Sequence, residues 1–142
     1  MNTNIYLDID GVLLVNGNNL ANFAHEFLVC VTSNYPTYWL TTHCRGDIFY
    51  TYTFLERTFP AKTLEVAKHI HQTNWRTNKT EAIDFSQPFL WFDDTLYEGE
   101  RTELFKHNVL ENWIEVDFRK DINYLQRFLT SFPIPINIVR KT

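Results

Sequence analysis

Residues 5–14 of the chain read IYLDIDGVLL, an apolar run that contains two acids, Asp8 and Asp10. An ionised carboxylate that leaves water without a partner either costs several kcal/mol or shifts its pKa until it is neutral. Acids in such a run therefore stand at the exposed end of a strand or hold a cation. Asp8 and Asp10 are accordingly the first candidate site residues.

Short apolar runs alternate with helical periodicity along the rest of the chain. The segment 4–9 has the composition of a strand that is covered on both faces, and Gly11 follows it. Similar runs predict strands over 37–42, 88–92 and 112–116, and alternating residues predict a short strand over 64–71. Helical spacing predicts helices over 20–31, 48–59, 98–107 and 122–129, with one or two turns over 79–85.

This alternation predicts the fold class and the domain organisation. Strands joined through helices favour βαβ units with right-handed crossovers, which build a parallel sheet. We therefore expect an α/β fold: a three-layer, Rossmann-like parallel sheet with helices on both faces. The 142 residues fit one domain, 1–142, because typical domains contain about 100 to 150 residues.

Composition and charge exclude several classes of protein. Hydrophobic residues make up 44% of the chain and charged residues 21%, which is far from the composition of a disordered chain. The net charge of −4 gives no general electrostatic reason to bind nucleic acid or a membrane, and no apolar run reaches membrane-spanning length. Two cysteines, Cys30 and Cys44, and an N-terminus without a signal-peptide pattern favour a cytoplasmic location.

Polar side chains follow three of the predicted strands where each strand ends. The carboxyl ends of parallel strands meet at one edge of a sheet, and ligands of such folds bind there. The residues that this geometry brings to one edge are Asp8 and Asp10, Thr41 and Thr42, and Asp93 and Asp94, with Lys79 opening the short helix before the third strand.

Four carboxylates at one edge require positive charge. Each close like-charge pair costs about 4 kcal/mol at an effective dielectric constant near 20. Mg²⁺ offsets this repulsion naturally, because it prefers one or two carboxylates, several waters and a substrate phosphate oxygen. The sequence therefore predicts a Mg²⁺ site, with Lys79 supplying the remaining positive charge.

Four ordered motifs carry a family resemblance. DIDGV at 8–12, WLTT at 39–42, a lysine at 79 and FLWFDD at 89–94 together resemble the haloacid-dehalogenase-like (HAD) hydrolase superfamily. The likeness covers most of the chain and implies a HAD-like core. It also implies a phosphoric monoester hydrolase, since an acid two residues after the first aspartate favours a phosphatase over a dehalogenase.

The resemblance assigns a role to each catalytic candidate. Asp8 attacks the phosphorus of a phosphomonoester and forms an aspartyl-phosphate intermediate. Asp10 protonates the leaving oxygen and then accepts a proton from the attacking water. Thr41 bonds a phosphoryl oxygen, and Lys79 neutralises charge on the phosphate and the nucleophile.

The same resemblance implies a ligand set for Mg²⁺. Asp8, the backbone carbonyl of Asp10 and the pair Asp93 and Asp94 surround the ion. We assign direct ligation to Asp94 and a water-mediated contact to Asp93, with the order of that pair open. Gly11 allows a sharp turn where a side chain would block the substrate.

Several assignments have alternatives. Thr42 competes with Thr41 for the phosphate contact, and Lys62 and Lys68 compete with Lys79. His43 and Cys44 suggest a zinc or thiol site, but no second paired ligand set with suitable spacing accompanies them. Loop residues that flank the predicted pocket, and that are candidate substrate contacts, are Arg45, Trp75 and Arg76.

A large cap domain over the site is not expected. The gap 12–19 is a short turn, and 43–78 already contains core elements. An open site admits a phosphorylated substrate that is bulky or macromolecular, with nucleic acid entering only as a substrate. A neighbouring subunit in an oligomer is another source of a lid, and the C-terminal segment FPIPINIVRKT (132–142) runs along the body or into a partner.

Two other functions compete with a phosphatase. A non-catalytic phosphate-sensing or protein-interaction module would keep the site architecture without turnover. A phospho-receiver domain also uses acids, a threonine and a lysine, but its paired acids come first, whereas here the series ends on Asp93 and Asp94.

Overall fold

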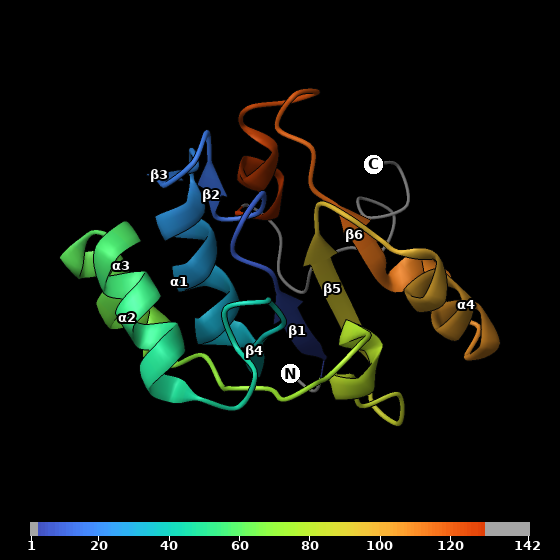
Figure 1. Cartoon of the computed structure of the whole chain (residues 1–142). Coiled ribbons are helices and arrows are strands. Elements are labelled where there is room, and N and C mark those ends of the chain that lie inside the picture. Colours follow the sequence, from blue (N-terminus) through green and yellow to red (C-terminus); the bar gives the residue numbers. More distant parts are fainter. Residues whose placement is uncertain (1–2, 130–142) are drawn as a thin grey trace.

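A four-stranded parallel sheet forms the centre of the structure, a computed structural model in which residues 3–129 are described (Figure 1). Its strands, in spatial order, are β4 (Thr37–Trp39), β1 (Asn4–Leu7), β5 (Phe89–Asp93) and β6 (Trp113–Glu115). Helices flank the sheet, so the chain has a mixed α/β fold of the Rossmann-like kind.

The order of the strands reverses at β1. The chain passes from β1 to β4 on one side and then crosses back to β5 on the other side, and both pairings are parallel. Leu7 is therefore in register with Trp39 and with Phe92. Such a reversal is the point at which open parallel sheets bind ligands, outside the carboxyl ends of the strands.

Helices cover both faces of the sheet. On one face lies α1 (Ala24–Asn34), with α2 (Ile48–Thr58) and α3 (Ala61–Ala67) beyond it, and on the other lies α4 (Glu98–Lys106), as Figure 1 shows. Three 3-10 turns complete the structure: η1 (Lys79–Ala82), η2 (Leu110–Asn112) and η3 (Tyr124–Phe128). Among residues 3–129, no helix has the length and apolar character needed to cross a bilayer.

Alternation along the strands divides their side chains between two cores. In β1, Ile5 and Leu7 belong to the core under α1, whereas Tyr6 belongs to the core under α4. In β5, Phe92 belongs to the core under α1 and Trp91 to the core under α4, and neither is exposed to solvent. Each such side chain stabilises the fold by about 1.5 to 3 kcal/mol, which explains why residues 5–7 of β1 and 89–92 of β5 are apolar at every position.

Aromatic contacts join β5 to the helical layer. Phe92 packs edge-on against Phe27 of α1, with ring centroids 5.2 Å apart, and against Phe128 of η3 at 5.1 Å. Phe27 and Phe128 also meet each other at 6.0 Å. Pairs of this geometry add about 0.5 to 1.5 kcal/mol each beyond burial, so the end of β5 is held firmly in place.

The helix predicted from residue 20 begins four residues later. Residues Asn19–Leu20 form β3, which pairs antiparallel with β2 (Leu14–Val15) in a small hairpin. Phe23 then adopts a left-handed conformation with φ of 64°, which no residue inside a helix can keep. The apolar spacing therefore predicted the helix correctly and its start wrongly.

The strand predicted over 64–71 is wrong, because the first half of this segment belongs to α3 and the rest forms a turn that ends in a single bridge at His71. Pro60 stands at the N-cap, a position where a missing N–H has no cost, and Thr63 and Ala67 are buried one helical turn apart. His71 alone pairs with a strand: its N–H donates to Thr37 O (2.9 Å) at the edge of β4.

The last predicted helix, 122–129, is shorter and tighter than expected. It contains only η3, in which Tyr124, Leu125 and Phe128 are buried. The apolar spacing correctly identified the buried face but not the type of turn. The segment FPIPINIVRKT lies outside the described residues.

Candidate functional site

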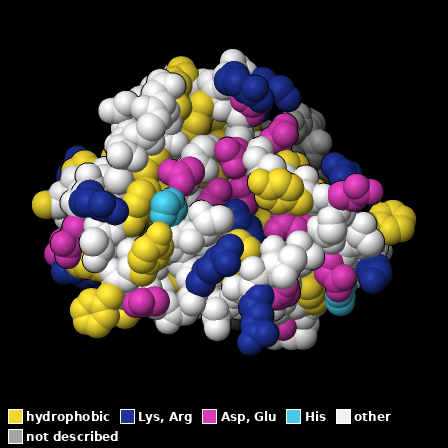
Figure 2. Space-filling model, in the orientation of Figure 1, with side chains coloured by type: hydrophobic (Ala, Val, Ile, Leu, Met, Phe, Trp, Pro, Cys, Tyr) yellow, Lys and Arg dark blue, Asp and Glu magenta, His cyan; other side chains and the backbone are white. Residues whose placement is uncertain are grey.

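The ends of β1 and β5 bring two acids side by side. The ladder between these strands continues one residue beyond β1, where Asp8 N–H donates to Phe92 O at 3.1 Å. Asp8 therefore lies next to Asp93, the last residue of β5. Carboxylate oxygens of Asp8, Asp93 and Asp94 lie within 4.8 Å of one another. Figure 2 shows acidic side chains grouped in the middle of this face of the molecule.

Asp93 is fully engaged in hydrogen bonds. One carboxylate oxygen accepts bonds from Lys79 Nζ (2.6 Å) and Trp91 Nε1 (3.2 Å), and the other accepts bonds from the backbone N–H groups of Asp94 (2.8 Å) and Thr95 (3.3 Å). The side chain is almost completely buried. Burial and the neighbouring Asp8 raise the pKa of Asp93 to about 9, although Lys79 opposes the shift.

Lys79 is the cation of the site. It opens η1, and its backbone N–H donates to the buried Glu100 carboxylate at 2.9 Å, which anchors the start of the turn to α4. Its Nζ lies 2.6 Å from Asp93 Oδ2 and 3.5 Å from Asp8 Oδ2. Burial lowers the pKa of Lys79, but Asp8 and Asp93 outweigh burial and raise it, so the ammonium stays charged.

Asp8 is buried like Asp93 but holds fewer partners. Its Oδ1 accepts a bond from the N–H of Ile9 at 2.8 Å. Its Oδ2 faces Lys79 at 3.5 Å, which is an ion pair without a short hydrogen bond. Asp8 also interacts with the Asp93 side chain, but its oxygens are held by fewer and longer contacts than those of Asp93.

Gly11 allows the loop after β1 to approach the loop after β5. Its φ is +80°, and a Cβ at this position would lie only 2.2 Å from Asp94 Oδ2. Any side chain here would displace the Asp94 carboxylate. Glycine at position 11 thus keeps the exposed Asp94 beside Asp8.

A cavity of about 170 Å³ opens over these groups. Asp8, Lys79 and Asp93 line it, and Trp75 forms part of its wall. A larger cavity of about 560 Å³ adjoins it, because Asp10 and Asp94 line both. The larger cavity lies between the β2–β3 hairpin and the segment 116–119. A ligand group bound over Asp8 would therefore have room to continue toward the hairpin.

Two threonines follow β4, and the cavity is lined by Thr42, which is the alternative to Thr41 as the phosphate contact. Thr41, the predicted phosphate contact, is fully buried, and its Oγ1 accepts the backbone N–H of His43 at 3.3 Å. Thr42 is exposed and lines the cavity over Asp8. The sheet places residue 41 inward because it continues the alternation of β4, so the threonine that lines the cavity is Thr42.

Asp10 has a partner that the sequence did not indicate. His43 Nε2 lies 2.7 Å from Asp10 Oδ2, and the His43 ring stacks on Phe54 of α2 with centroids 3.6 Å apart. From the sequence, His43 was a candidate only for a zinc or thiol site together with Cys44. Its position two residues after Thr41, directly beyond a strand end, was the one signal that could have placed it at the site.

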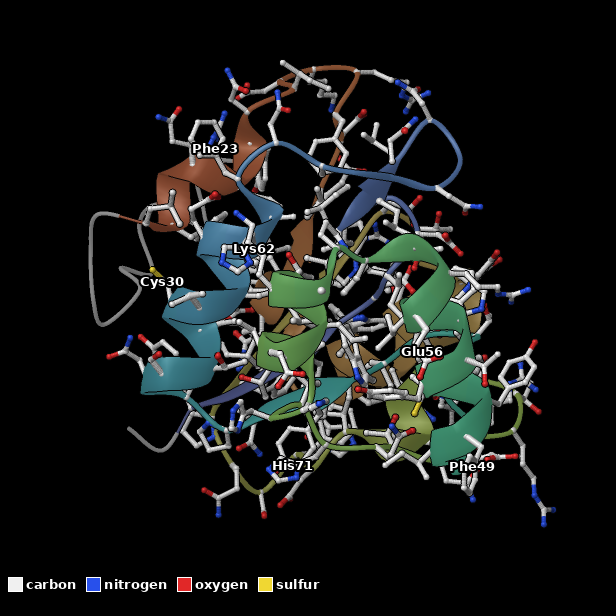
Figure 3. All side chains as sticks on the ribbon, turned by 90° about the vertical axis from the view of Figure 1, so that its left-hand side faces the viewer. Phe23, Cys30, Phe49, Glu56, Lys62 and His71 are labelled. Atoms are coloured by element: carbon white, nitrogen blue, oxygen red, sulfur yellow. The ribbon has the colours of Figure 1, made fainter. Side chains whose placement is uncertain are left out.

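The other candidates lie away from these carboxylates or at their margin. Lys62 is on α3 (Figure 3), and Lys68 follows α3 and pairs with Glu65 at 2.7 Å. The Arg45 guanidinium covers the ring of Trp75 at 4.2 Å, so this pair stands at the wall of the cavity. Lys79 is therefore the lysine that the fold places at the site.

A cysteine–histidine metal site does not form in the described part of the chain. Cys44 is buried, and its Sγ contacts Gln72 Oε1 instead of His43. Across residues 3–129, the group of three or more potential metal ligands is Asp8, Asp93 and Asp94.

The donor set at the strand ends fits a hard cation. Three carboxyl groups lie around one ammonium, and the raised pKa of Asp93 indicates that a further negative charge is unfavourable there without another cation. Oxygen donors of this kind suit Mg²⁺, Ca²⁺ or Mn²⁺ and not a soft metal. A divalent ion would balance the charge that Lys79 leaves uncompensated.

Comparisons with protein-family models, with curated proteins and with solved structures gave no match for this chain. The arguments about its function therefore depend on the residues and geometry described above.

Proposed function

We propose that the protein is a Mg²⁺-dependent phosphatase with a HAD-like core, which hydrolyses a phosphomonoester through an aspartyl-phosphate on Asp8. One observation carries the proposal: acids from two strand ends meet around one lysine, and one of them, Asp8, lines the cavity and is held more loosely than the other. Phosphoryl transfer needs a nucleophile and positive charge around the transferred group, and this arrangement supplies both.

Asp8, and not Asp93, is the nucleophile in this proposal. Both carboxylates are buried beside Lys79, but Asp93 accepts four hydrogen bonds, which hold its oxygens in place. Asp8 accepts one short bond and faces the cavity. Attack by Asp8 on phosphorus forms the Asp8–phosphate bond as the ester P–O bond breaks.

Proton transfer falls to Asp10. It is on the same loop as Asp8, two residues further, and it lines both cavities. Asp10 gives a proton to the departing ester oxygen and then takes one from the water that hydrolyses the aspartyl-phosphate. Lys79 compensates the charge on the nucleophile and the phosphoryl group. Thr42, which lines the cavity, is better placed than Thr41 to bond a phosphoryl oxygen.

The Mg²⁺ ligands in this proposal are the carboxylates of Asp8 and Asp94, with the Asp10 backbone carbonyl and a water-mediated contact from Asp93. The full set of bonds on Asp93 and the exposure of Asp94 favour this order of the pair. When bound, Mg²⁺ would neutralise charge on the nucleophile and the phosphoryl oxygens, as hard cations do in phosphoryl transfer.

The substrate we infer is a phosphate ester with an extended leaving group. Between β1 and α1 the chain inserts only the β2–β3 hairpin, so no large cap closes over Asp8 among the described residues. The adjoining cavity beside that hairpin gives room for the rest of the substrate. An open site of this kind accepts a phosphate at the end of a bulky molecule.

The test is hydrolysis of an aryl phosphate by the purified protein with Mg²⁺ and with a chelator. We expect turnover that requires Mg²⁺ and is absent from Asp8→Asn purified in the same way. Intact protein that binds Mg²⁺ and phosphate but hydrolyses no member of a broad phosphoester panel would contradict the proposal. That result would favour the phosphate-sensing alternative.

A further inference from the structure

His43 is held in place on every side. Its backbone N–H donates to Thr41 Oγ1 at 3.3 Å, and its carbonyl accepts the Thr51 hydroxyl of α2 at 2.7 Å. Its ring lies flat on Phe54, with 9° between the planes and 3.6 Å between the centroids. These contacts hold the backbone and the plane of the imidazole, and Nε2 reaches Asp10 Oδ2 at 2.7 Å.

Asp10 depends on this contact more than its neighbours do. Its backbone is fixed, because Asp10 bridges to Leu14 and Gly11 N–H donates to Leu14 O at 2.9 Å. Its side chain is 56% exposed, and His43 is the residue that bonds its carboxyl group within residues 3–129. Without His43, the carboxyl would rotate freely in solvent above the cavity.

The contact also distinguishes the two oxygens of Asp10. When His43 carries its proton on Nε2, it donates to Asp10 Oδ2 and occupies that oxygen. Oδ1 then remains as the oxygen that faces a ligand and carries the mobile proton. A general acid works only when its proton points at the accepting atom, so the choice of oxygen matters for the rate.

We propose that His43 is a positioning residue that orients the Asp10 carboxyl group for proton transfer, an inference that rests on the proposed phosphatase function. In the first step, the proton on Asp10 Oδ1 passes to the ester oxygen as its bond to phosphorus breaks and the bond from Asp8 forms. In the second, water attacks the aspartyl-phosphate, its proton passes to Asp10 Oδ1, and phosphate leaves Asp8. His43 keeps its own proton throughout.

The dependence on leaving group tests this role. A poor leaving group, such as an alkoxide, needs protonation, whereas 2,4-dinitrophenolate leaves without it. We expect His43→Leu to lower kcat/KM for an alkyl phosphate by about 10- to 100-fold and for dinitrophenyl phosphate by less than about 3-fold. The ratio kcat/KM reports only the steps up to phosphorylation of Asp8, so slow hydrolysis of the intermediate does not mask the effect.

Two further variants make the test specific. His43→Gln keeps an N–H donor near Nε2, and we expect it to recover much of the alkyl phosphate activity that His43→Leu loses. In an Asp10→Asn background, adding His43→Leu should cause no further loss, because both changes remove the same proton transfer. Thermal unfolding checks that each variant is folded, and if His43→Leu is not, His43→Ala, which also lacks an N–H donor, replaces it with the same expected loss.

Three results would overturn the inference. An equal loss on both esters in His43→Leu, or no loss on either, would show that His43 does not act through proton transfer, while the phosphatase function would stand. An additional loss in the Asp10→Asn background would show that His43 acts independently of Asp10. A wild-type protein without activity on either ester would overturn the proposed function and this role together.

Discussion

The ends of β1 and β5 present two buried aspartates that share one lysine, yet the two carboxylates differ. Asp93 accepts four hydrogen bonds and lies 2.6 Å from Lys79 Nζ. Asp8 accepts one short bond and lies 3.5 Å from the same nitrogen. The strand ends are equivalent in position, so the difference comes from their surroundings. Asp93 accepts bonds from two backbone N–H groups of the following loop and from the Lys79 and Trp91 side chains, whereas the following loop gives Asp8 one N–H, that of Ile9.

This difference separates a structural acid from a reactive one. A carboxylate whose oxygens are all engaged is held rigidly and cannot form a new bond without breaking several hydrogen bonds. A buried carboxylate with fewer hydrogen bonds carries part of the desolvation cost without compensation, and a ligand or a cation can relieve that cost. The following changes test whether the two acids differ in function as they do in geometry.

The largest effect is expected from neutralising each acid in turn. Asp8→Asn should lower phosphate ester turnover by at least about 10⁴-fold, because it removes the nucleophile. Asp93→Asn should lower turnover by only about 100-fold, because it weakens a position that supports the cation. Acid-quench trapping of the phosphorylated protein, followed by mass spectrometry, should find the phosphate on Asp8. Equal losses in the two variants would remove the distinction between the acids.

The next largest effect concerns the lysine that both acids share. Lys79→Met keeps the length of the side chain but leaves three carboxylates without their ammonium. Removing one partner of a buried ion pair costs about 3 to 5 kcal/mol, so urea denaturation should show a loss of that size, with turnover reduced about 100-fold. Lys68→Met, at an exposed pair with Glu65, is the control and should leave the midpoint unchanged. A stable Lys79→Met protein would mean that Lys79 does not hold the acids together.

A smaller effect is expected from the glycine that lets the loops approach. Gly11→Ala and Gly17→Ala both force an alanine into a left-handed conformation, at φ of +80° and +86°, which costs about 1 to 2 kcal/mol. Only Gly11→Ala also displaces Asp94, because nothing lies within 4 Å of a Cβ at Gly17. Isothermal titration should therefore show Mg²⁺ affinity lowered about 10-fold in Gly11→Ala and unchanged in Gly17→Ala. Equal Mg²⁺ affinities in Gly11→Ala and Gly17→Ala would show that Asp94 does not bind the metal.

The last effect is on stability and not on turnover: the free energy of unfolding depends on pH in the absence of metal. The pKa of Asp93, about 9 in the folded protein, exceeds the value of about 4 for an unfolded chain. Between these pH values the folded chain holds one proton more than the unfolded chain, so the contribution of Asp93 to the free energy of unfolding falls as pH rises. Denaturation in chelator from pH 5 to 8.5 should show wild type losing stability relative to Asp93→Asn. If wild type instead gained stability relative to Asp93→Asn as pH rises, the predicted direction would be contradicted.

The sequence predicted the central strands and the acids at their ends because both follow from local chemistry. Apolar runs such as 89–92 can be stable only as covered strands, and the charges of Asp8 and Asp93 can follow such runs only where the strands end. Parallel pairing then brings the ends together whatever the loops do. The positions of Asp8 and Asp93 at one edge were predictable for this reason. Lys79, which opens η1 and ends no strand, was predicted from the resemblance and from its position before β5.

The sequence did not reveal the features that depend on tertiary packing. The pairing of Asn19–Leu20 with Leu14–Val15 overrides helical spacing, because the hairpin bonds form outside the window in which periodicity is read. The contact between His43 and Asp10 joins residues that are 33 positions apart through Phe54 of α2. The choice between Thr41 and Thr42 depends on which face residue 41 meets, and that depends on how far the alternation of β4 continues.

The most direct test of the central claim, that acids from β1 and β5 hold one divalent ion beside the nucleophile, is a crystal structure of the protein with Mn²⁺ in place of Mg²⁺. We predict one anomalous peak at the strand ends, within bonding distance of carboxylate oxygens of Asp8 and Asp94, while Asp93 keeps its bonds to Lys79 and to the backbone. A well-ordered site with no ion there, or an ion bound only by other residues, would contradict the account.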